Sequence, residues 1–387
     1  MFQHKLKLYE EKDAVETRSG SFWLNFRKRE QNRQKTVERF TRDMDGVVLA
    51  HRFKIIGLLG RGTFGSVYRA VDIYTSKRLA LKVSNDKYYN FSLTKEGELI
   101  RALNVVGGAR MVTNIVGSTM WRGFKCVLYR ECVGTLLSPI TMHPNIGVSL
   151  NLIRIYTRQL LQALCFLNSK RLIHCDIKPE NVLVCRVGSA AIKLGDFGAS
   201  QSFHQPELCF NYVQNRCYRA PEVFLGMPIT RAIDMWSIGC IMVELFAGCM
   251  LFDGSDSIET FHYLMELFGF PPADMIEFGS NSPFYFISSG NRYFLKPIEG
   301  RDFNAPGSKE LLEILGLYSD KIWTMKTGGL NVTECYEFFN LVSKILVYRP
   351  NARLRPENAL HHVFLNKKIR PRVKNLKRKR YSKECPF

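Results

Sequence analysis

The chain has 387 residues, of which 46% are hydrophobic, 12% aromatic and 23% charged, and its 55 lysines and arginines against 35 acidic residues give a net charge of +20. This composition excludes a mainly disordered chain, and the length suits one large or two modest lobes. The charge is uneven, because the 22 residues from Asn366 onward carry 10 basic side chains and one acidic one. A dedicated nucleic-acid-binding domain would instead concentrate its charge on a folded face.

Cysteine usage and hydropathy predict a reducing compartment and no membrane span. The eleven cysteines are scattered without a C-x-x-C pair, so they indicate neither a disulfide framework nor a zinc cluster. The first residues lack the apolar stretch of a signal peptide. The most apolar segment, residues 237–252, contains Glu244 and is shorter than the ~20 residues that a membrane helix needs. We therefore expect an intracellular protein.

The first half of the chain predicts an extension followed by a small β-rich lobe. Residues 1–46 are mixed in charge, and a compact domain begins near residue 47. Residues 53–83 are β-branched and apolar, with glycines between the runs, which is typical of strands joined by tight turns. A helix is expected at residues 93–103, and further strands near 111–117 and 125–129. This lobe ends at about residue 132.

The second half predicts a helical lobe from about residue 133 to residue 365. Residues 151–168 place their leucines on one helical face, and similar periodicity recurs at 234–246, 257–268 and 336–348. Residues 273–330 are irregular in pattern and are interpreted as an insertion on this lobe. Residues 366–387 form a basic tail.

The first motif that carries chemistry is a glycine-rich turn between two strand-like segments. Gly60, Gly62 and Gly65 form a G-x-G-x-x-G-x-V pattern that ends at Val67. Glycines allow backbone N–H groups to approach phosphate oxygens closely. Alone, the pattern equally fits a dinucleotide-binding loop or a plain turn. The next segment, residues 66–71, resembles a strand rather than the start of a helix, which argues against the dinucleotide-binding loop.

A single lysine then stands in an apolar strand. Lys82 lies within residues 79–83, and it either faces water on an edge strand or is buried beside an anionic partner, because an unpaired buried charge is costly. Two carboxylates on the following helix, Glu96 and Glu98, are candidates. Glu96 shares the inward face with the helix's apolar residues, so we predict that it pairs with Lys82.

The strongest signal is the sequence His-Cys-Asp-Ile-Lys-Pro-Glu-Asn at residues 174–181, followed by Asp-Phe-Gly at 196–198. Phosphoryl transfer needs a carboxylate that orients the attacking hydroxyl and accepts its proton, and Asp176 fits this role. Asn181 and Asp196 offer oxygen ligands for magnesium, and Lys178 can neutralise charge on the transferred group. Each residue alone is equally well a solvated loop residue, but the whole set in this order and spacing is specific.

On these motifs the chain resembles a eukaryotic protein kinase over residues 47–365. Later landmarks of that family are Ala-Pro-Glu at 220–222, Asp-Met-Trp-Ser-Ile-Gly at 234–239, and Arg353. The resemblance implies an α+β, two-lobed fold with a five-stranded antiparallel sheet and one helix over a mainly helical lobe. It also implies that Glu222 pairs with Arg353 and that Asp234 holds the backbone of the catalytic loop.

The same resemblance implies a transferase that moves the terminal phosphoryl group of ATP to Ser and Thr hydroxyls of protein substrates, with Mg2+ as the metal. Asp176 and Lys178 would be catalytic, and Asn181 and Asp196 would be the metal ligands. Tyr129 would guard the adenine pocket, although residues 130–132 depart from the usual acidic-first pattern of the hinge. The residues implied to bind the cofactor are Gly60, Gly62, Gly65, Val67, Ala80, Lys82, Glu96, Glu131 and Cys132.

Finer features resemble the CMGC group of kinases. Residues 46–49 are similar to the LAMMER-type branch, while His-Cys-Asp and residues 212–219 are similar to the DYRK and HIPK branches. Cys175 replaces the arginine that in most kinases pairs with a phosphorylated residue, but those two branches share this cysteine. In them a tyrosine at the position of Tyr212 is autophosphorylated. Tyr212 is therefore expected to be a regulatory phosphorylation site, with a packed aromatic residue as the alternative, and dual specificity stays open.

The basic cluster at residues 374–380 favours a nuclear import signal, with a cytoplasmic protein carrying a solvated tail as the alternative. The sequence disfavours two other classes of function. The chain's catalytic set argues against an inactive kinase-like scaffold, and the lack of a basic platform with interleaved aromatic residues argues against specific nucleic-acid binding. We expect a monomer that acts on proteins and does not bind membranes.

Overall fold

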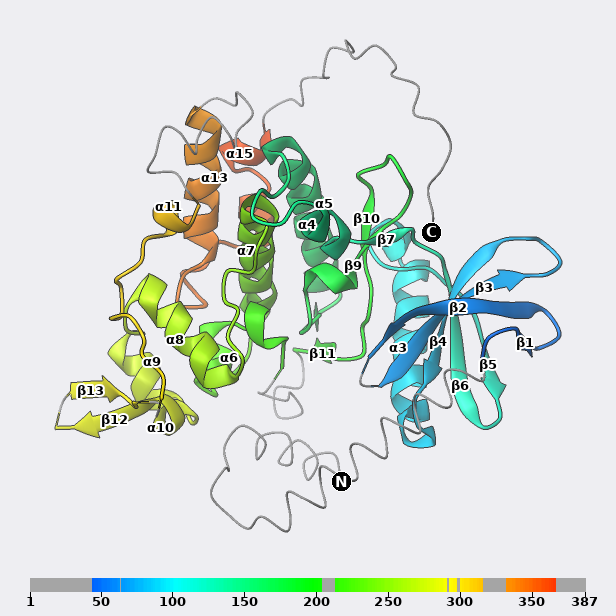
Figure 1. Cartoon of the computed structure of the whole chain (residues 1–387), viewed down its shortest axis with the longest axis horizontal. Helices are drawn as coiled ribbons and strands as arrows, with labels where there is room; N and C mark the ends of the chain where they lie inside the picture. Colours follow the sequence, from blue (N-terminus) through cyan, green and yellow to red (C-terminus); the bar gives the residue numbers. More distant parts are fainter. Residues whose placement is uncertain are drawn as a thin grey trace.

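The computed structural model describes residues 44–62, 64–203, 213–290, 292–297, 300–315 and 332–366. Within these ranges a small lobe built on a sheet lies beside a larger helical lobe (Figure 1). In the part of the chain that is described, no helix has the length and apolar character needed to cross a membrane. The two-lobed α+β architecture predicted from the sequence is confirmed.

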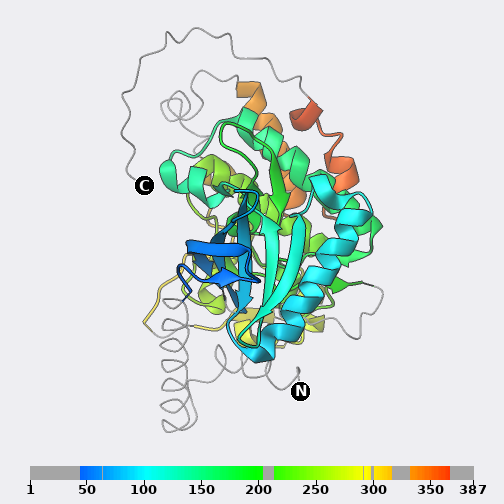
Figure 2. The same cartoon turned by 90° about the vertical axis from the view of Figure 1, so that its right-hand side faces the viewer.

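The small lobe contains a six-stranded antiparallel sheet in the order β1-β2-β3-β4-β6-β5, and helix α3 packs beside it (Figure 2). The prediction of five strands is wrong by one, because the short β1 adds to the sheet edge and pairs Val48 with Lys54. The elements are β1 (Val48–Leu49), β2 (Phe53–Arg61), β3 (Gly65–Asp72), β4 (Arg78–Ser84), the 3-10 turn η1 (Lys87–Tyr89), α3 (Asn90–Val105), the 3-10 turn η2 (Gly108–Arg110), β5 (Ile115–Trp121) and β6 (Phe124–Arg130).

The core of this lobe explains why Lys82 lies where it does. Leu81 and Val83 on either side of it are fully buried, and β4 is flanked by β3 and β6, so Lys82 is on a central strand and not on an edge. Met44 is also fully buried in this core, although the sequence placed it in the N-terminal extension. The hydrophobic packing of the domain therefore begins before residue 47.

The large lobe is built around α5 and α7. Ser149 caps α5 by accepting a hydrogen bond from the Leu152 N–H, and every residue of α7 from Ile233 to Ala247 is buried. Its elements are α4 (Leu137–Met142), α5 (Leu150–Ser169), β8 (Leu172–Ile173), η3 (Pro179–Asn181), β9 (Val182–Val184), β10 (Ile192–Leu194), β11 (Gln201–Ser202), η5 (Arg216–Tyr218), α6 (Pro221–Phe224), α7 (Ala232–Ala247), α8 (Ser257–Phe268), α13 (Val332–Ile345), α14 (Pro356–Ala359) and α15 (Val363–Asn366). The strand β7 (Gly134–Thr135) joins this lobe by pairing with β9.

The region predicted to be irregular contains regular elements where it is described. They are α9 (Ala273–Phe278), α10 (Ser282–Tyr285), the hairpin β12 (Phe286–Ser289) with β13 (Arg292–Leu295), and α11 (Leu311–Ile314). Each is too short to give a clear periodic signal, which is why the sequence did not reveal them. The helix predicted at 336–348 is α13, which begins four residues earlier and ends at Ile345.

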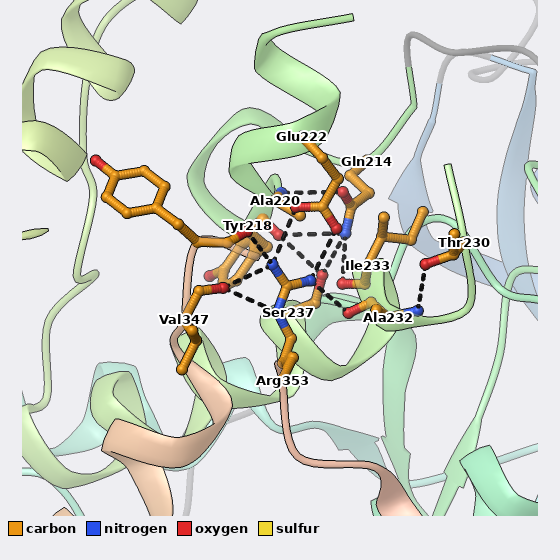
Figure 3. Close-up of polar contacts among 11 residues, drawn as sticks. Gln214, Tyr218, Ala220, Glu222, Thr230, Ala232, Ile233, Ser237, Val347 and Arg353 are labelled. Atoms are coloured by element: carbon orange, nitrogen blue, oxygen red, sulfur yellow. Dashed lines mark hydrogen bonds and ion pairs between the residues drawn. The ribbon is translucent and has the colours of Figure 1, made fainter. Parts of the chain in front are cut away.

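A buried polar network joins α6, α7 and the C-terminal part of the large lobe (Figure 3). The Arg353 guanidinium donates to both carboxylate oxygens of Glu222 at 2.8 and 3.0 Å, and neither side chain is exposed to solvent. Arg353 also donates to the carbonyls of Ala232 and Val347. The pairing of Glu222 with Arg353 predicted from the family resemblance is therefore confirmed.

Gln214 ties the preceding segment to the same platform. Its amide nitrogen donates to the Ile233 carbonyl at 3.0 Å and to Ser237 Oγ at 2.8 Å, and its amide oxygen accepts from the Ala220 N–H at 3.0 Å. Its φ of 67° lies in the left-handed region, which a non-glycine residue adopts only where its surroundings hold it. The Gln214 side chain thus helps to fix the segment after residue 212 to α7.

Arg353→Met tests the contribution of this buried pair to stability. The substitution leaves the Glu222 carboxylate buried without its partner, so we expect a loss of about 3–5 kcal/mol in the free energy of unfolding, measured by chemical denaturation. The matched control is Arg349→Met, which removes the 2.6 Å pair with Asp274 in which both side chains are 47% exposed. That control should cost far less, because an ion pair between solvent-exposed side chains contributes little to stability. Equal losses in the two variants would contradict the account.

Candidate active site

Lys82 lies at the centre of the candidate active site. Its ammonium is 2.8 Å from Glu96 Oε2 and 2.8 Å from Asp196 Oδ1. These three side chains come from β4, from α3 and from the segment after β10. The predicted pairing of Lys82 with Glu96 is confirmed, whereas Glu98 points away and pairs with Lys95. The direct contact between Lys82 and Asp196 was not predicted, because nothing in the sequence brings residues 114 positions apart together.

Burial and charge act against each other in this triad. Burial favours the neutral amine of Lys82, but the Asp196 and Glu96 carboxylates outweigh it and raise the pKa of Lys82, so the side chain stays cationic. Burial raises the pKa of Glu96, and Lys82 opposes that effect. Burial acts on Asp196 in the same direction, yet the nearby Lys82 lowers the pKa of Asp196 overall. Of the two carboxylates, Asp196 is therefore the more firmly ionised. Its side chain is 45% exposed.

The catalytic loop places three of the predicted residues in contact. Asn181 donates from its amide nitrogen to the Asp176 carbonyl at 2.8 Å and to Asp176 Oδ2 at 2.9 Å. The Lys178 ammonium lies 3.0 Å from the same Oδ2 atom. The Asn181 amide and the Lys178 ammonium thus both hold Asp176 through Oδ2. The other carboxylate oxygen, Oδ1, contacts neither of these two groups.

Asp234 fixes the backbone of this loop, as the family resemblance implied. From the first turn of α7 its carboxylate accepts from the N–H groups of His174 at 2.7 Å and of Cys175 at 3.0 Å. Cys175 has a φ of 66°, and Asp196 a φ of 55°, so both segments that carry site residues hold a strained left-handed residue. The two hydrogen bonds to Asp234 hold the backbone around Cys175 in this strained conformation.

The Asp-Phe-Gly segment is held by its neighbours. Phe197 is buried, and its ring centroid is 4.8 Å from that of His174. His174 also contacts the Gly195 carbonyl through Nε2 at 3.0 Å. With Phe197 packed in the core, Asp196 is directed toward Lys82.

The glycine-rich turn lies between β2 and β3 and comes close to β4. Gly60 pairs with Val67 across the hairpin, and the Gly62 N–H donates to the Gly65 carbonyl at 2.9 Å. A Cβ atom on Gly65 would lie 2.8 Å from the Val83 carbonyl oxygen, so only glycine allows this approach. Val67 lies opposite Lys82 in the sheet, and Ala80 is two residues from Lys82 on the same face of β4.

The predicted hinge follows β6. Tyr129 is buried, and its hydroxyl lies 3.5 Å from Glu96 Oε1, so it closes the site behind Lys82. Glu131 is held by the Arg69 guanidinium, with 2.6 Å between Nε and Oε1. This ion pair was not predicted from the sequence. The only indication of it there is that the residues on β3 and in the hinge carry opposite charges. Cys132 is partly exposed and precedes β7.

These residues fit a nucleoside triphosphate that is bound to Mg2+. The Asn181 amide nitrogen is occupied by Asp176, so the residue offers its amide oxygen, and Asp196 offers a half-exposed carboxylate. Hard oxygen donors of this kind suit Mg2+. Lys82 supplies a fixed positive charge for phosphate oxygens, and the glycines at 60, 62 and 65 leave the backbone of the turn without side chains that would obstruct a phosphate. Tyr212 and the basic cluster 374–380 lie outside the described residues.

Comparison with known proteins identifies the family. The family model "Protein kinase domain" matches residues 53–365. The human dual specificity tyrosine-phosphorylation-regulated kinase 4 is 32% identical over 338 residues, which cover 85% of this chain and 61% of the relative. Dual specificity tyrosine-phosphorylation-regulated kinase 2 of Drosophila melanogaster is 32% identical over 322 residues, covering 82% and 42%. Dual specificity protein kinase YAK1 of Saccharomyces cerevisiae is 30% identical over 356 residues, covering 85% and 44%.

The chain thus spans about half the length of these curated relatives. The match nevertheless includes both lobes, the glycine-rich turn, the catalytic loop and Arg353. The chain belongs to the protein kinase family, and its homologues are DYRK-type kinases of the CMGC group.

Proposed function

We propose that this chain transfers the terminal phosphoryl group of ATP to Ser and Thr hydroxyls of protein substrates. The observation that carries the proposal is the position of Lys82, which lies 2.8 Å from both Glu96 and Asp196. This arrangement holds a cation for phosphate oxygens beside a carboxylate for the metal. A scaffold without catalytic activity has no need to keep both contacts together with Asp176 and Asn181.

Each site residue has a separate role in the proposed reaction. Lys82 binds phosphate oxygens of the nucleotide, and Asn181 and Asp196 hold the Mg2+, whose charge stabilises the phosphoryl group in transfer. Asp176 orients the substrate hydroxyl and accepts its proton at the carboxylate oxygen that Asn181 and Lys178 leave open. Lys178 stabilises the negative charge that develops on the phosphoryl oxygens. Residues 131–132 bind the adenine through the backbone.

Asp176→Asn tests the role of the catalytic carboxylate. Asparagine keeps the size of the side chain but cannot accept the proton, so we expect turnover on a Ser/Thr peptide array to fall by roughly 10²- to 10⁴-fold. The affinity for Mg-ATP should stay close to that of the wild type. The control is Asp302→Asn, which changes an exposed carboxylate on the large lobe. Near-normal turnover of the Asp176→Asn protein would refute the assignment.

Autophosphorylation on Tyr212 is the finer part of the proposal. It is supported by the names of the relatives, which describe dual specificity and regulation by tyrosine phosphorylation. It is also supported by Gln214, which anchors the segment that follows Tyr212. Nuclear localisation and a monomeric state remain predictions from the sequence.

The test of this part is a phosphopeptide map of the full chain produced in bacteria. We expect phosphate on Tyr212 in the wild type and none in the Asp176→Asn protein, because the chain itself would be the only source of the modification in that host. An active wild-type protein with unmodified Tyr212 would contradict the proposal.

A further inference from the structure

Two cysteines lie together where the hinge meets β9. Cys132 precedes β7 and Cys185 follows β9, and these strands pair antiparallel with Gly134 opposite Val184. The Val133 N–H extends the pairing by donating to the Val184 carbonyl at 2.9 Å. This backbone pairing brings the two segments to the spacing of neighbouring strands, ~4.7–4.9 Å. Because this hydrogen bond joins Val133 to Val184 in an antiparallel pairing, Cys132 is next to Cys185 across the two segments, and each thiol shifts the pKa of the other.

Both thiols are within reach of small solutes. Cys132 and Cys185 are each partly exposed, whereas Cys126, Cys175 and Cys240 are buried. Cys249 is exposed but does not take part in this pair, so it serves as a reference thiol. The pair therefore combines access to solvent with the proximity of two thiols on neighbouring segments.

The surroundings of the pair separate the two thiols chemically. The neighbouring Cys132 thiol, together with the positive charges of Lys193 and Arg186, lowers the pKa of Cys185 to about 7. The neighbouring Cys185 and burial raise the pKa of Cys132. Lys193 is itself fixed, because its ammonium donates to the Ala109 carbonyl and to Asn114. Near neutral pH a substantial fraction of Cys185 is thus the nucleophilic thiolate, while Cys132 keeps its proton.

We propose that Cys185 and Cys132 form a peroxide-responsive pair that closes to a disulfide at the hinge and weakens nucleotide binding. The Cys185 thiolate attacks one oxygen of hydrogen peroxide, the O–O bond breaks, and hydroxide leaves and is protonated to water. The Cys132 sulfur then attacks the resulting sulfenic acid, the S–O bond breaks, and hydroxide leaves with the Cys132 proton as water. The two cysteines lose two electrons in all, and peroxide accepts them.

The consequence for the nucleotide rests on the proposed function, whereas the disulfide itself does not. An S–S bond of about 2.05 Å is much shorter than a non-bonded contact between two sulfur atoms. Closing the pair therefore draws the hinge toward β9 and displaces the backbone at residues 131–132. These are the positions proposed to bind adenine.

The first experiment reads the disulfide directly. The reduced full chain is treated with hydrogen peroxide, alkylated and digested with trypsin, which places Cys132 in peptide 131–154 and Cys185 in peptide 172–186. We expect these peptides to be joined with the loss of two hydrogens, and fragment ions to place the bond on Cys185 rather than on Cys175. Cys185→Ser should abolish the joined species and Cys249→Ser should retain it. Free, alkylated Cys132 and Cys185 after peroxide would overturn the proposal.

A second variant checks the order of the steps. In Cys132→Ser the resolving thiol is missing, so the sulfenic acid on Cys185 should persist and be labelled by dimedone. In the wild type, the rate of Cys185 alkylation by iodoacetamide should reach half its maximum near pH 7, because the thiolate fraction rises through its pKa. Dimedone labelling of Cys132 instead of Cys185 in the wild type would contradict the assigned roles.

The last experiment separates regulation from function. Oxidation should weaken Mg-ATP binding by at least about tenfold in calorimetry, and dithiothreitol should restore it. Cys185→Ser should bind Mg-ATP like the reduced wild type and should not respond to peroxide. A disulfide that forms without changing the affinity would contradict the effect on the nucleotide. A reduced wild type that binds no Mg-ATP would contradict the proposed function, and the peptide masses would still decide whether the pair closes.

Discussion

The contact of one ammonium with two carboxylates is the interaction on which the rest of the site depends. Lys82 lies on a central strand between buried neighbours, so its charge is stable there only while Glu96 and Asp196 compensate it. Because Glu96 belongs to α3 and Asp196 follows β10, the position of the helix and that of the Asp-Phe-Gly segment are coupled. Tyr129 adds to this coupling through its hydroxyl contact with Glu96. A displacement of either element would leave a buried charge without its partner.

The large lobe supplies a rigid base for the residues that act on the substrate. Helix α7 is buried from Ile233 to its end. Near its start Asp234 accepts hydrogen bonds from the catalytic-loop backbone, and Ser237 and the Ile233 carbonyl accept hydrogen bonds from Gln214. Arg353 joins α6 to the start of α7 through Glu222 and the Ala232 carbonyl. These buried polar contacts are fully satisfied, which allows them to specify one arrangement of the loops around them.

Local sequence patterns were sufficient to predict a β-rich lobe followed by a helical lobe and the pairing of Lys82 with Glu96. The family resemblance supplied the roles of Glu222, Arg353 and Asp234. The sequence was insufficient where the determinant is three-dimensional. The contact of Lys82 with Asp196 and that of Arg69 with Glu131 join residues far apart in the chain. The strand β1 and the elements between residues 273 and 315 are too short for periodicity to reveal. The thiol pair Cys132–Cys185 depends on the register of β7 with β9, which no local pattern encodes.

The most direct test of the central claim compares two carboxylates on the same helix. The affinity of the full chain for Mg-ATP is measured by calorimetry for Glu96→Gln, which removes a charge from the triad, and for Glu98→Gln, which removes an exposed charge two residues away. The account predicts that Glu96→Gln binds Mg-ATP at least about tenfold more weakly than the wild type, because Lys82 is no longer held in place, and that Glu98→Gln binds like the wild type. Equal affinities for the two variants would contradict it.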